Sequence, residues 1–278
     1  MPNWYVSIPD AKRALSIPVT STADDGTLGI VIEGVSRLLD DYAGMPLYAH
    51  VATKYFTVRE SECLDLDQPF TAITSVRTDV GGAASYDTTL SSTCYWPTGA
   101  GGDYNARSAS PPRPYWELHR RQNASGSFPS GVDRGVEITG TWGYTNQTRS
   151  LAATAATAWT ATATSLEANV ASALYPGYTL LVDSEQIYVK DTGTASNLVN
   201  VDRGVNGTSA AAHTSATPIS VYEYPVISEA CRFQVSLTWR ARDMSGYGGD
   251  NGVAARTPAG GLHPFTKSQL SMRAPVAK

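Results

Sequence analysis

The side chains of this chain that could do chemistry are few and stand far apart in the sequence. The histidines do not occur in HExxH or in any other metal-ligand spacing: they are His50, His119, His213 and His263. No GxSxG motif marks a nucleophilic serine. The sequence therefore predicts no catalytic residues, no metal site, no cofactor and no enzymatic activity.

Four ionisable residues between positions 183 and 213 are the strongest remaining candidates for chemistry. Asp183 and Glu185 have the residue types of a glycosidase carboxylate pair, but they flank a predicted hairpin turn, where alternation does not place both on one face. Arg203 and His213 lie in predicted loops and could contact a ligand, yet such residues more often support local structure. We expect a structural role for all four.

Composition narrows the class of protein further. The 278 residues are 42% hydrophobic and 17% charged, with 24 glycines and 16 prolines, which is typical of one large or two modest globular domains rich in turns. A net charge of −4 argues against a dedicated nucleic-acid binder, because phosphate contacts need clustered Lys and Arg. The three cysteines lack CxxC spacing, which favours reduced thiols in a cytoplasm. Because the chain has neither a signal-like start nor 18 consecutive apolar residues, we expect no membrane span.

Three segments have the spacing of helices. Residues 7–15 begin with a capping serine and a proline in the first turn. Residues 24–44 place apolar side chains three or four positions apart on one stripe, which we expect to fill the core: Leu28, Val31, Ile32, Val35, Leu38, Leu39 and Tyr42. Residues 225–243 repeat this spacing near the end of the chain.

Between these helices the pattern changes to short runs of period two, bounded by Gly, Pro, Asp and Ser, which predicts strands and hairpins. The candidate strands before position 150 are Tyr48–Val58, Thr71–Thr78, Leu90–Tyr95, Tyr115–His119 and Val136–Trp142. Helices that bracket a strand-rich middle indicate an α+β fold.

A second strand-rich stretch interrupts this pattern before the last predicted helix. It opens with residues 151–164, where all but Leu151 and Trp159 are Ala or Thr, a composition that we interpret as a linker. Five strand-like runs follow, separated by turn residues. We predict a discontinuous core of residues 1–150 and 223–246, an inserted all-β domain of residues 151–222, and an extended C-terminal tail of residues 247–278.

The tail is the most basic part of the chain and shows no helical or long strand period. We expect it to be disordered alone and to fold on a partner protein. The side chains expected to dock there are Leu262, Phe265, Lys267, Leu270, Met272 and Arg273.

Several motifs occur in a recognisable order: LGIVIEGVSRLLDDYAG, LDLDQPFTAITSVRTD, a strand ending in CYWP, VEITGTWGY, and the long final helix. This order, over residues 5–148 and 224–243, resembles the head–tail connector (adaptor) family of long-tailed bacteriophages. The inserted stretch, with its DSEQ turn and its RGVNGT and AAAH segments, is similar to a small β module found in phage structural proteins.

The resemblance implies a non-enzymatic virion protein of the phage neck, at the head–tail junction, assembled in the host cytoplasm. Its partners would be further copies of itself in a ring of about twelve subunits, the portal protein, and the next neck or tail protein. Double-stranded DNA would pass through the ring without sequence-specific binding. The alternative is a tail-tip or decoration protein that binds a host-surface ligand through the inserted domain, which would form trimers or monomers.

Overall fold

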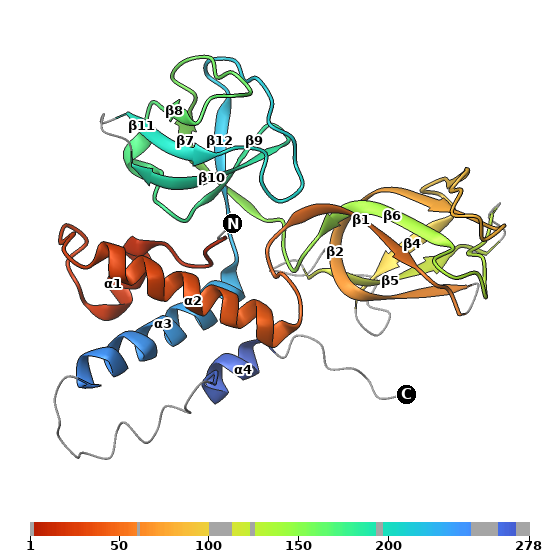
Figure 1. Ribbon diagram of the computed structural model, residues 1–278, viewed down its shortest axis with the longest axis horizontal. Helices are drawn as coiled ribbons and strands as arrows, with labels where there is room; N and C mark the ends of the chain where they lie inside the picture. The colour runs from red at the N-terminus through yellow and green to blue at the C-terminus, as the bar shows by residue number, and fades with distance from the viewer. Residues whose placement is uncertain are drawn as a thin grey trace. The chain divides into compact units, whose positions relative to one another are not determined.

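The computed structural model describes residues 3–59, 62–99, 113–122, 126–192, 197–245 and 261–270. Over these residues the predicted α+β class with a strand-rich middle is confirmed: four α-helices accompany two antiparallel sheets of six strands each (Figure 1). The chain forms two compact units. The first joins Met1–Gly44 to Gln147–Met272, and the second contains Met45–Asn146.

This division differs from the predicted domains, because the helices group with the second strand-rich stretch and not with the first. The connection is made by the N-terminal segment. The Asn3 side chain accepts hydrogen bonds from the Thr179 hydroxyl and the Asn206 amide, at 2.7 and 2.8 Å. Its backbone carbonyl accepts a hydrogen bond from Arg37, while the Trp4 indole donates to Glu33. One short segment therefore ties the helices to the strands of residues 148–222.

Helices α1 and α2 of the first unit have the predicted bounds to within one residue, and α3 begins where predicted but ends two residues later. Helix α1, Ile8–Leu15, is capped by Ser7, whose hydroxyl accepts a hydrogen bond from the Asp10 N–H. Helix α2, Asp25–Ala43, ends at Gly44, whose left-handed φ of 68° suits a residue without a Cβ atom. Helix α3, Pro225–Ser245, packs against both α1 and α2.

The apolar stripe of α2 fills the core as predicted, with one exception. Leu28, Ile32 and Leu39 are fully buried and Val35 is nearly so, while Val31 and Leu38 are half-buried. Tyr42, in contrast, is 47% exposed, so its assignment to the core was wrong. It lies in the last turn of the helix, where its ring faces the ammonium group of Lys267 instead of the core.

The second sheet of the chain completes the first unit and is called here the β module. Its strands run in the order β7-β12-β9-β10-β11-β8, all antiparallel. Their bounds are β7 Thr148–Thr154, β8 Ser165–Glu167, β9 Thr179–Val182, β10 Glu185–Thr192, β11 Leu198–Asp202 and β12 Pro218–Tyr222.

The Ala/Thr-rich segment that opens the β module is part of its sheet, so the prediction of a linker was wrong. Residues 148–154 form β7, which pairs with β12 and places Ala153 opposite Ile219. Ala153, Ala155 and Trp159 are all buried in the module's core. Small side chains give a weak strand pattern, but here they let the chain pack closely against larger neighbours.

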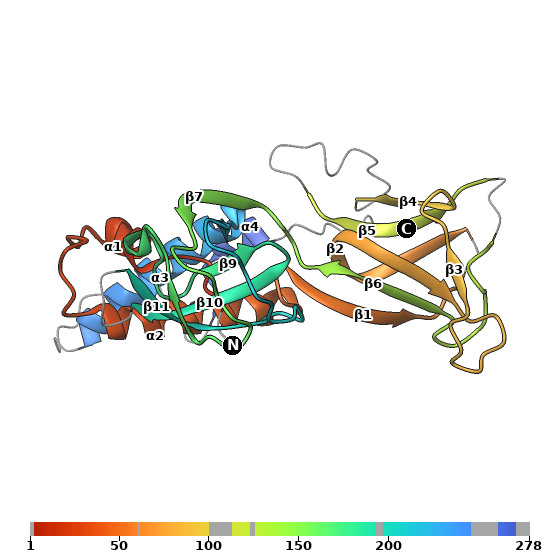
Figure 2. The ribbon, with the colours of Figure 1, turned by 90° about the horizontal axis from the view of Figure 1, so that it is seen from above.

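The sheet of the second unit has the order β1-β6-β2-β5-β4, with β3 also paired to β2. Strands β1, β6 and β2 lie side by side (Figure 2). The bounds are β1 His50–Phe56, β2 Cys63–Thr78, β3 Thr88–Leu90, β4 Tyr95–Thr98, β5 Tyr115–Arg120 and β6 Val136–Trp142. Its core is rich in aromatic residues, including Phe70, Phe128 and Trp142.

Two predictions for this sheet differ from the structure by more than two residues at a strand end or in the number of strands. Strand β2 begins eight residues earlier than expected, at Cys63, because a register shift between Asp65 and Phe70 accommodates Pro69 within the strand. The single strand predicted over residues 90–95 is two strands, β3 and β4, separated by a turn in which the Cys94 N–H donates to the Ser91 carbonyl.

Among the described residues, no helix is long and apolar enough to cross a bilayer.

Candidate functional site

The four ionisable residues singled out in the β module form one connected cluster. The Arg203 guanidinium donates from Nε and Nη2 to the two carboxylate oxygens of Glu185, each at 2.7 Å. The ring of His213 lies between two carboxylates, with Nε2 2.8 Å from Glu185 Oε2 and Nδ1 2.7 Å from Asp183 Oδ2. Strand β10, its turn to β9, and the loop between β11 and β12 are thereby joined.

This charged cluster is closed to solvent at its centre. The side chains of Glu185 and His213 are 1% exposed and that of Arg203 is 6% exposed. Burial by itself raises the pKa of the Glu185 carboxyl, but the hydrogen bonds from Arg203, Ala211, His213 and Gly204 outweigh burial and lower that pKa to about 2. The carboxylate stays ionised, and its two oxygens already accept five hydrogen bonds. A carboxylate bonded in this way stabilises the fold, and its oxygens are already used as acceptors, so it is poorly suited to bind a substrate.

The cluster also explains the motifs of the β module. Asp183 and Glu185 come from the DSEQ turn, Arg203 and Gly204 from the RGVNGT segment, and His213 from AAAH. These three motifs are separated in sequence, but DSEQ supplies the buried carboxylate of Glu185, and RGVNGT and AAAH each supply hydrogen-bond donors to it. The DSEQ, RGVNGT and AAAH residues thus hold the turn and the loop of the β module together through hydrogen bonds and ion pairs.

A different kind of surface lies on the outer side of α2, opposite its buried stripe. Ile30 is 74% exposed there, the largest exposed fraction among the described large apolar side chains. Gly26 and Gly34 lie one turn to either side, and a Cβ atom at either position would meet open space. Asp41 continues the same stripe and is exposed. We call this surface, made of Gly26, Ile30, Gly34 and Asp41, the α2 face.

A groove of about 490 Å³ lies between α1 and α3 on the first unit. The half-buried side chains of Phe233 and Leu237 give it an apolar floor. Three arginines, Arg13, Arg232 and Arg240, surround this floor, against a single acidic residue, Glu229. We call it the basic groove.

Part of the C-terminal tail folds onto the first unit, which corrects the prediction of a wholly extended tail. Pro264–Leu270 form helix α4, which packs against α3. Leu262 is 2% exposed, and the Phe265 ring lies 4.8 Å from that of Phe233, with Phe265 itself 39% exposed. The helix was missed because only residues 262, 266 and 270 repeat at a spacing of four, too few to give a clear period.

The other tail residues that were expected to dock on a partner differ in their exposure. Lys267 is exposed on α4, and Leu270 is half-buried. Met272 and Arg273 lie outside the described residues. Leu262 is therefore an anchor of the chain's own fold, while Phe265 and Lys267 keep accessible surface for a partner.

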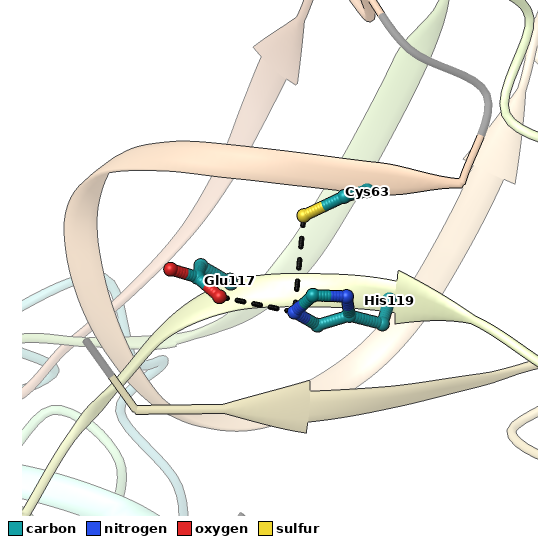
Figure 3. A group of neighbouring side chains, drawn as sticks. All are labelled: Cys63, Glu117 and His119. Atoms are coloured by element: carbon teal, nitrogen blue, oxygen red, sulfur yellow. Dashed lines mark hydrogen bonds and ion pairs between the residues drawn. The ribbon is translucent and has the colours of Figure 1, made fainter. Parts of the chain in front are cut away.

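The second unit brings together three residues that the sequence did not connect: Cys63 from β2, and Glu117 and His119 from β5 (Figure 3). Cys63 was considered only as a thiol and His119 only as an isolated histidine. Their proximity depends on the pairing register of two strands that are more than 50 positions apart in the chain. A search for linear spacing cannot detect such a cluster.

Comparisons of the chain with protein-family models, with curated proteins and with solved structures return no match. What the protein does must therefore be inferred from its own surfaces and clusters.

Proposed function

We propose that the chain is a structural virion protein, a head–tail connector of a long-tailed bacteriophage that forms a ring between portal and tail. In this proposal the helices and the β module form one unit of the subunit, and DNA passes through the ring. The order of sequence motifs supports this function. The observation that carries it is the presence of two unlike lateral surfaces on the first unit, the α2 face and the basic groove.

A ring requires such a pair of surfaces, because copies related by a rotation contact one another head to tail. A surface that pairs with itself gives only a dimer. The α2 face and the basic groove are different surfaces of one subunit, so each can be occupied by a different neighbour.

The two surfaces are complementary in shape and charge. Ile30 projects from the α2 face, and Gly26 and Gly34 beside it leave room for another backbone to come close. The groove offers Phe233 and Leu237 as an apolar floor. The α2 face carries one exposed carboxylate, Asp41, whereas the groove has three arginines and one glutamate. We infer that the α2 face of each subunit docks in the basic groove of the next.

The exposed side of α4 supplies a third surface in this proposal. Phe265 and Lys267 are accessible there, and an aromatic ring beside a cation suits a partner with apolar and acidic groups. We assign this surface to the portal protein, and the loops of the second unit to the next neck or tail protein.

The test uses two variants, each of which removes one surface. Ile30→Asp destroys the α2 face and keeps the groove, whereas the double variant Arg232→Glu, Arg240→Glu destroys the groove and keeps the face. Wild-type protein mixed with portal rings should give about twelve subunits per portal by native mass spectrometry. Neither variant alone should form a ring.

A mixture of the two variants sharpens the test. The intact groove of one variant can still accept the intact α2 face of the other, so the mixture should form pairs that cannot extend. Rings formed by either variant alone would contradict the proposed contact. One or three wild-type copies in the complex would contradict the connector function and favour a host-binding tail or decoration protein.

A further inference from the structure

We propose that Cys63, Glu117 and His119 form a binding site for one zinc ion on the sheet of the second unit. The site is independent of the ring contacts, which all lie on the first unit. Strand geometry creates it: Cys63 is the direct cross-strand partner of His119 in the β2–β5 ladder, and Glu117 is two residues from His119 on the same face of β5. Figure 3 shows the three side chains converging from the two strands.

The distances between the side-chain atoms are close to those that a metal ion imposes. His119 Nε2 lies 3.8 Å from Cys63 Sγ and 3.0 Å from Glu117 Oε2, and all three ligand atoms are within 4.8 Å of one another. A tetrahedral zinc ion, with bonds of about 2.3 Å to sulfur and about 2.0 Å to nitrogen and oxygen, holds such atoms about 3.3–3.6 Å apart. The two distances from His119 differ from these values by a few tenths of an ångström, and side-chain rotation can bring Cys63 Sγ and Glu117 Oε2, which lie within 4.8 Å of each other, to the same spacing.

The types of donor atom select the metal. A thiolate and an imidazole favour zinc and other borderline transition metals, whereas magnesium and calcium require sites made of oxygen atoms. Three protein ligands leave the fourth position of a tetrahedral ion for water or for a group from another molecule. The donor set therefore fits an open zinc site better than any site for a hard cation.

The surroundings of the cluster already hold two ligands in place. The Thr98 hydroxyl on β4 donates a hydrogen bond to Glu117 Oε2 at 3.1 Å. The Trp96 ring, also from β4, lies parallel to the His119 ring with 6.0 Å between centroids. Supports of this kind fix the orientation of metal ligands and strengthen binding. With His119 24% and Glu117 18% exposed, an ion can also reach the site from solvent.

Zinc would link strands β2 and β5 at a specific place in this sheet. The β2–β5 ladder is continuous only from Cys63 to Asp65 before its register shifts at the bulge that precedes Phe70. An ion bound by Cys63, Glu117 and His119 joins the start of β2 to the end of β5 at this short ladder. Binding should therefore stabilise the second unit against unfolding.

Binding is tested with the full chain, produced without a histidine tag and freed of metal with a chelator. Cobalt(II), a spectroscopic substitute for zinc, should give the thiolate-to-cobalt charge-transfer band at one equivalent per chain, and zinc should displace it. Cys63→Ser should abolish the band, and His119→Gln should weaken binding by at least about tenfold. Zinc should raise the melting temperature of wild-type protein and not that of Cys63→Ser.

Matched controls separate the site from general metal binding. Cys94→Ala removes a buried thiol of the same unit, and His50→Gln removes a histidine of β1; both variants should keep the cobalt band and the zinc-induced stabilisation. Circular dichroism verifies that each variant is folded. Wild-type protein without the charge-transfer band, or Cys63→Ser with an undiminished band, would overturn the proposal and leave a His119–Glu117 hydrogen bond beside a thiol.

Discussion

The β module and the sheet of the second unit place their ionisable residues in opposite environments. The β module buries Glu185, Arg203 and His213 beneath its loops, beside a core of mostly aliphatic residues. The core of the second unit contains more aromatic side chains among its aliphatic ones, and this unit keeps Glu117 and His119 on the partly exposed face of β5.

The difference shows how a structural cluster is distinguished from a site that can bind. Around Glu185 every carboxylate oxygen is already occupied by donors of the chain, and solvent is excluded. Around His119 a thiol, an imidazole and a carboxylate converge while retaining access to solvent. Residue type alone does not separate the two clusters, because each combines a histidine with a glutamate.

The largest loss of stability is expected when a charge is introduced into the apolar core, away from a charged cluster like that of Glu185. Leu39→Asp places a carboxylate at a fully buried position of α2, so the first unit should lose more than about 4 kcal/mol and fail to fold. Far-ultraviolet circular dichroism and urea unfolding measure this loss. Ile30→Asp, on the exposed side of the same helix, should remain folded. A soluble Leu39→Asp protein with wild-type helicity would show that the stripe is not buried.

A smaller effect is expected from removing one member of the charged cluster. Glu185→Gln leaves the buried guanidinium of Arg203 without its counter-charge, which should cost about 3–5 kcal/mol. Glu117→Gln changes a partly exposed residue of the second unit and should cost no more than about 1 kcal/mol in metal-free protein. Urea unfolding of both variants checks the contrast. Equal losses would mean that the two clusters do not differ in their structural role.

Smaller than the loss from Glu185→Gln is the dependence of stability on pH. Because the pKa of Glu185 is lowered from 4.5 to about 2 in the folded protein, its contribution is complete above pH 4.5 and is lost as the pH falls towards 2. At pH 3 the first unit should be about 2 kcal/mol less stable than at pH 6 through this residue alone. Denaturant unfolding at several pH values measures the loss, and Glu185→Gln should remove this part of it. An unchanged profile in the variant would contradict the assignment.

Much of the fold could be predicted from the sequence, because local patterns determine it. Helices α1, α2 and α3 follow from capping residues and apolar spacing, and β6 has the predicted bounds. Strand β7 and helix α4 were missed because Ala, Thr and a few widely spaced apolar residues carry weak local signals. Their structure depends on pairing with β12 and on packing against α3.

The sites were less predictable than the fold, because they depend on contacts between distant residues. Asp183, Glu185, Arg203 and His213 were each expected to be structural, but that they share one cluster follows only from the folded hairpin and its loops. The proximity of Cys63 to His119 requires the register of β2 and β5, which a bulge shifts. No spacing rule for metal ligands includes such a pairing.

The interrupted path of the first unit affects how the protein must be made. Its helices α1 and α2 leave the ribosome first, but their partner α3 begins at Pro225, roughly 180 residues after Gly44. At about 5–20 residues per second, translation of that stretch takes roughly 10–40 s. The second unit can fold during this delay, while the apolar stripe of α2 remains without α3, the helix that it packs against. During synthesis the apolar stripe of α2 is therefore exposed for longer than the core of the second unit.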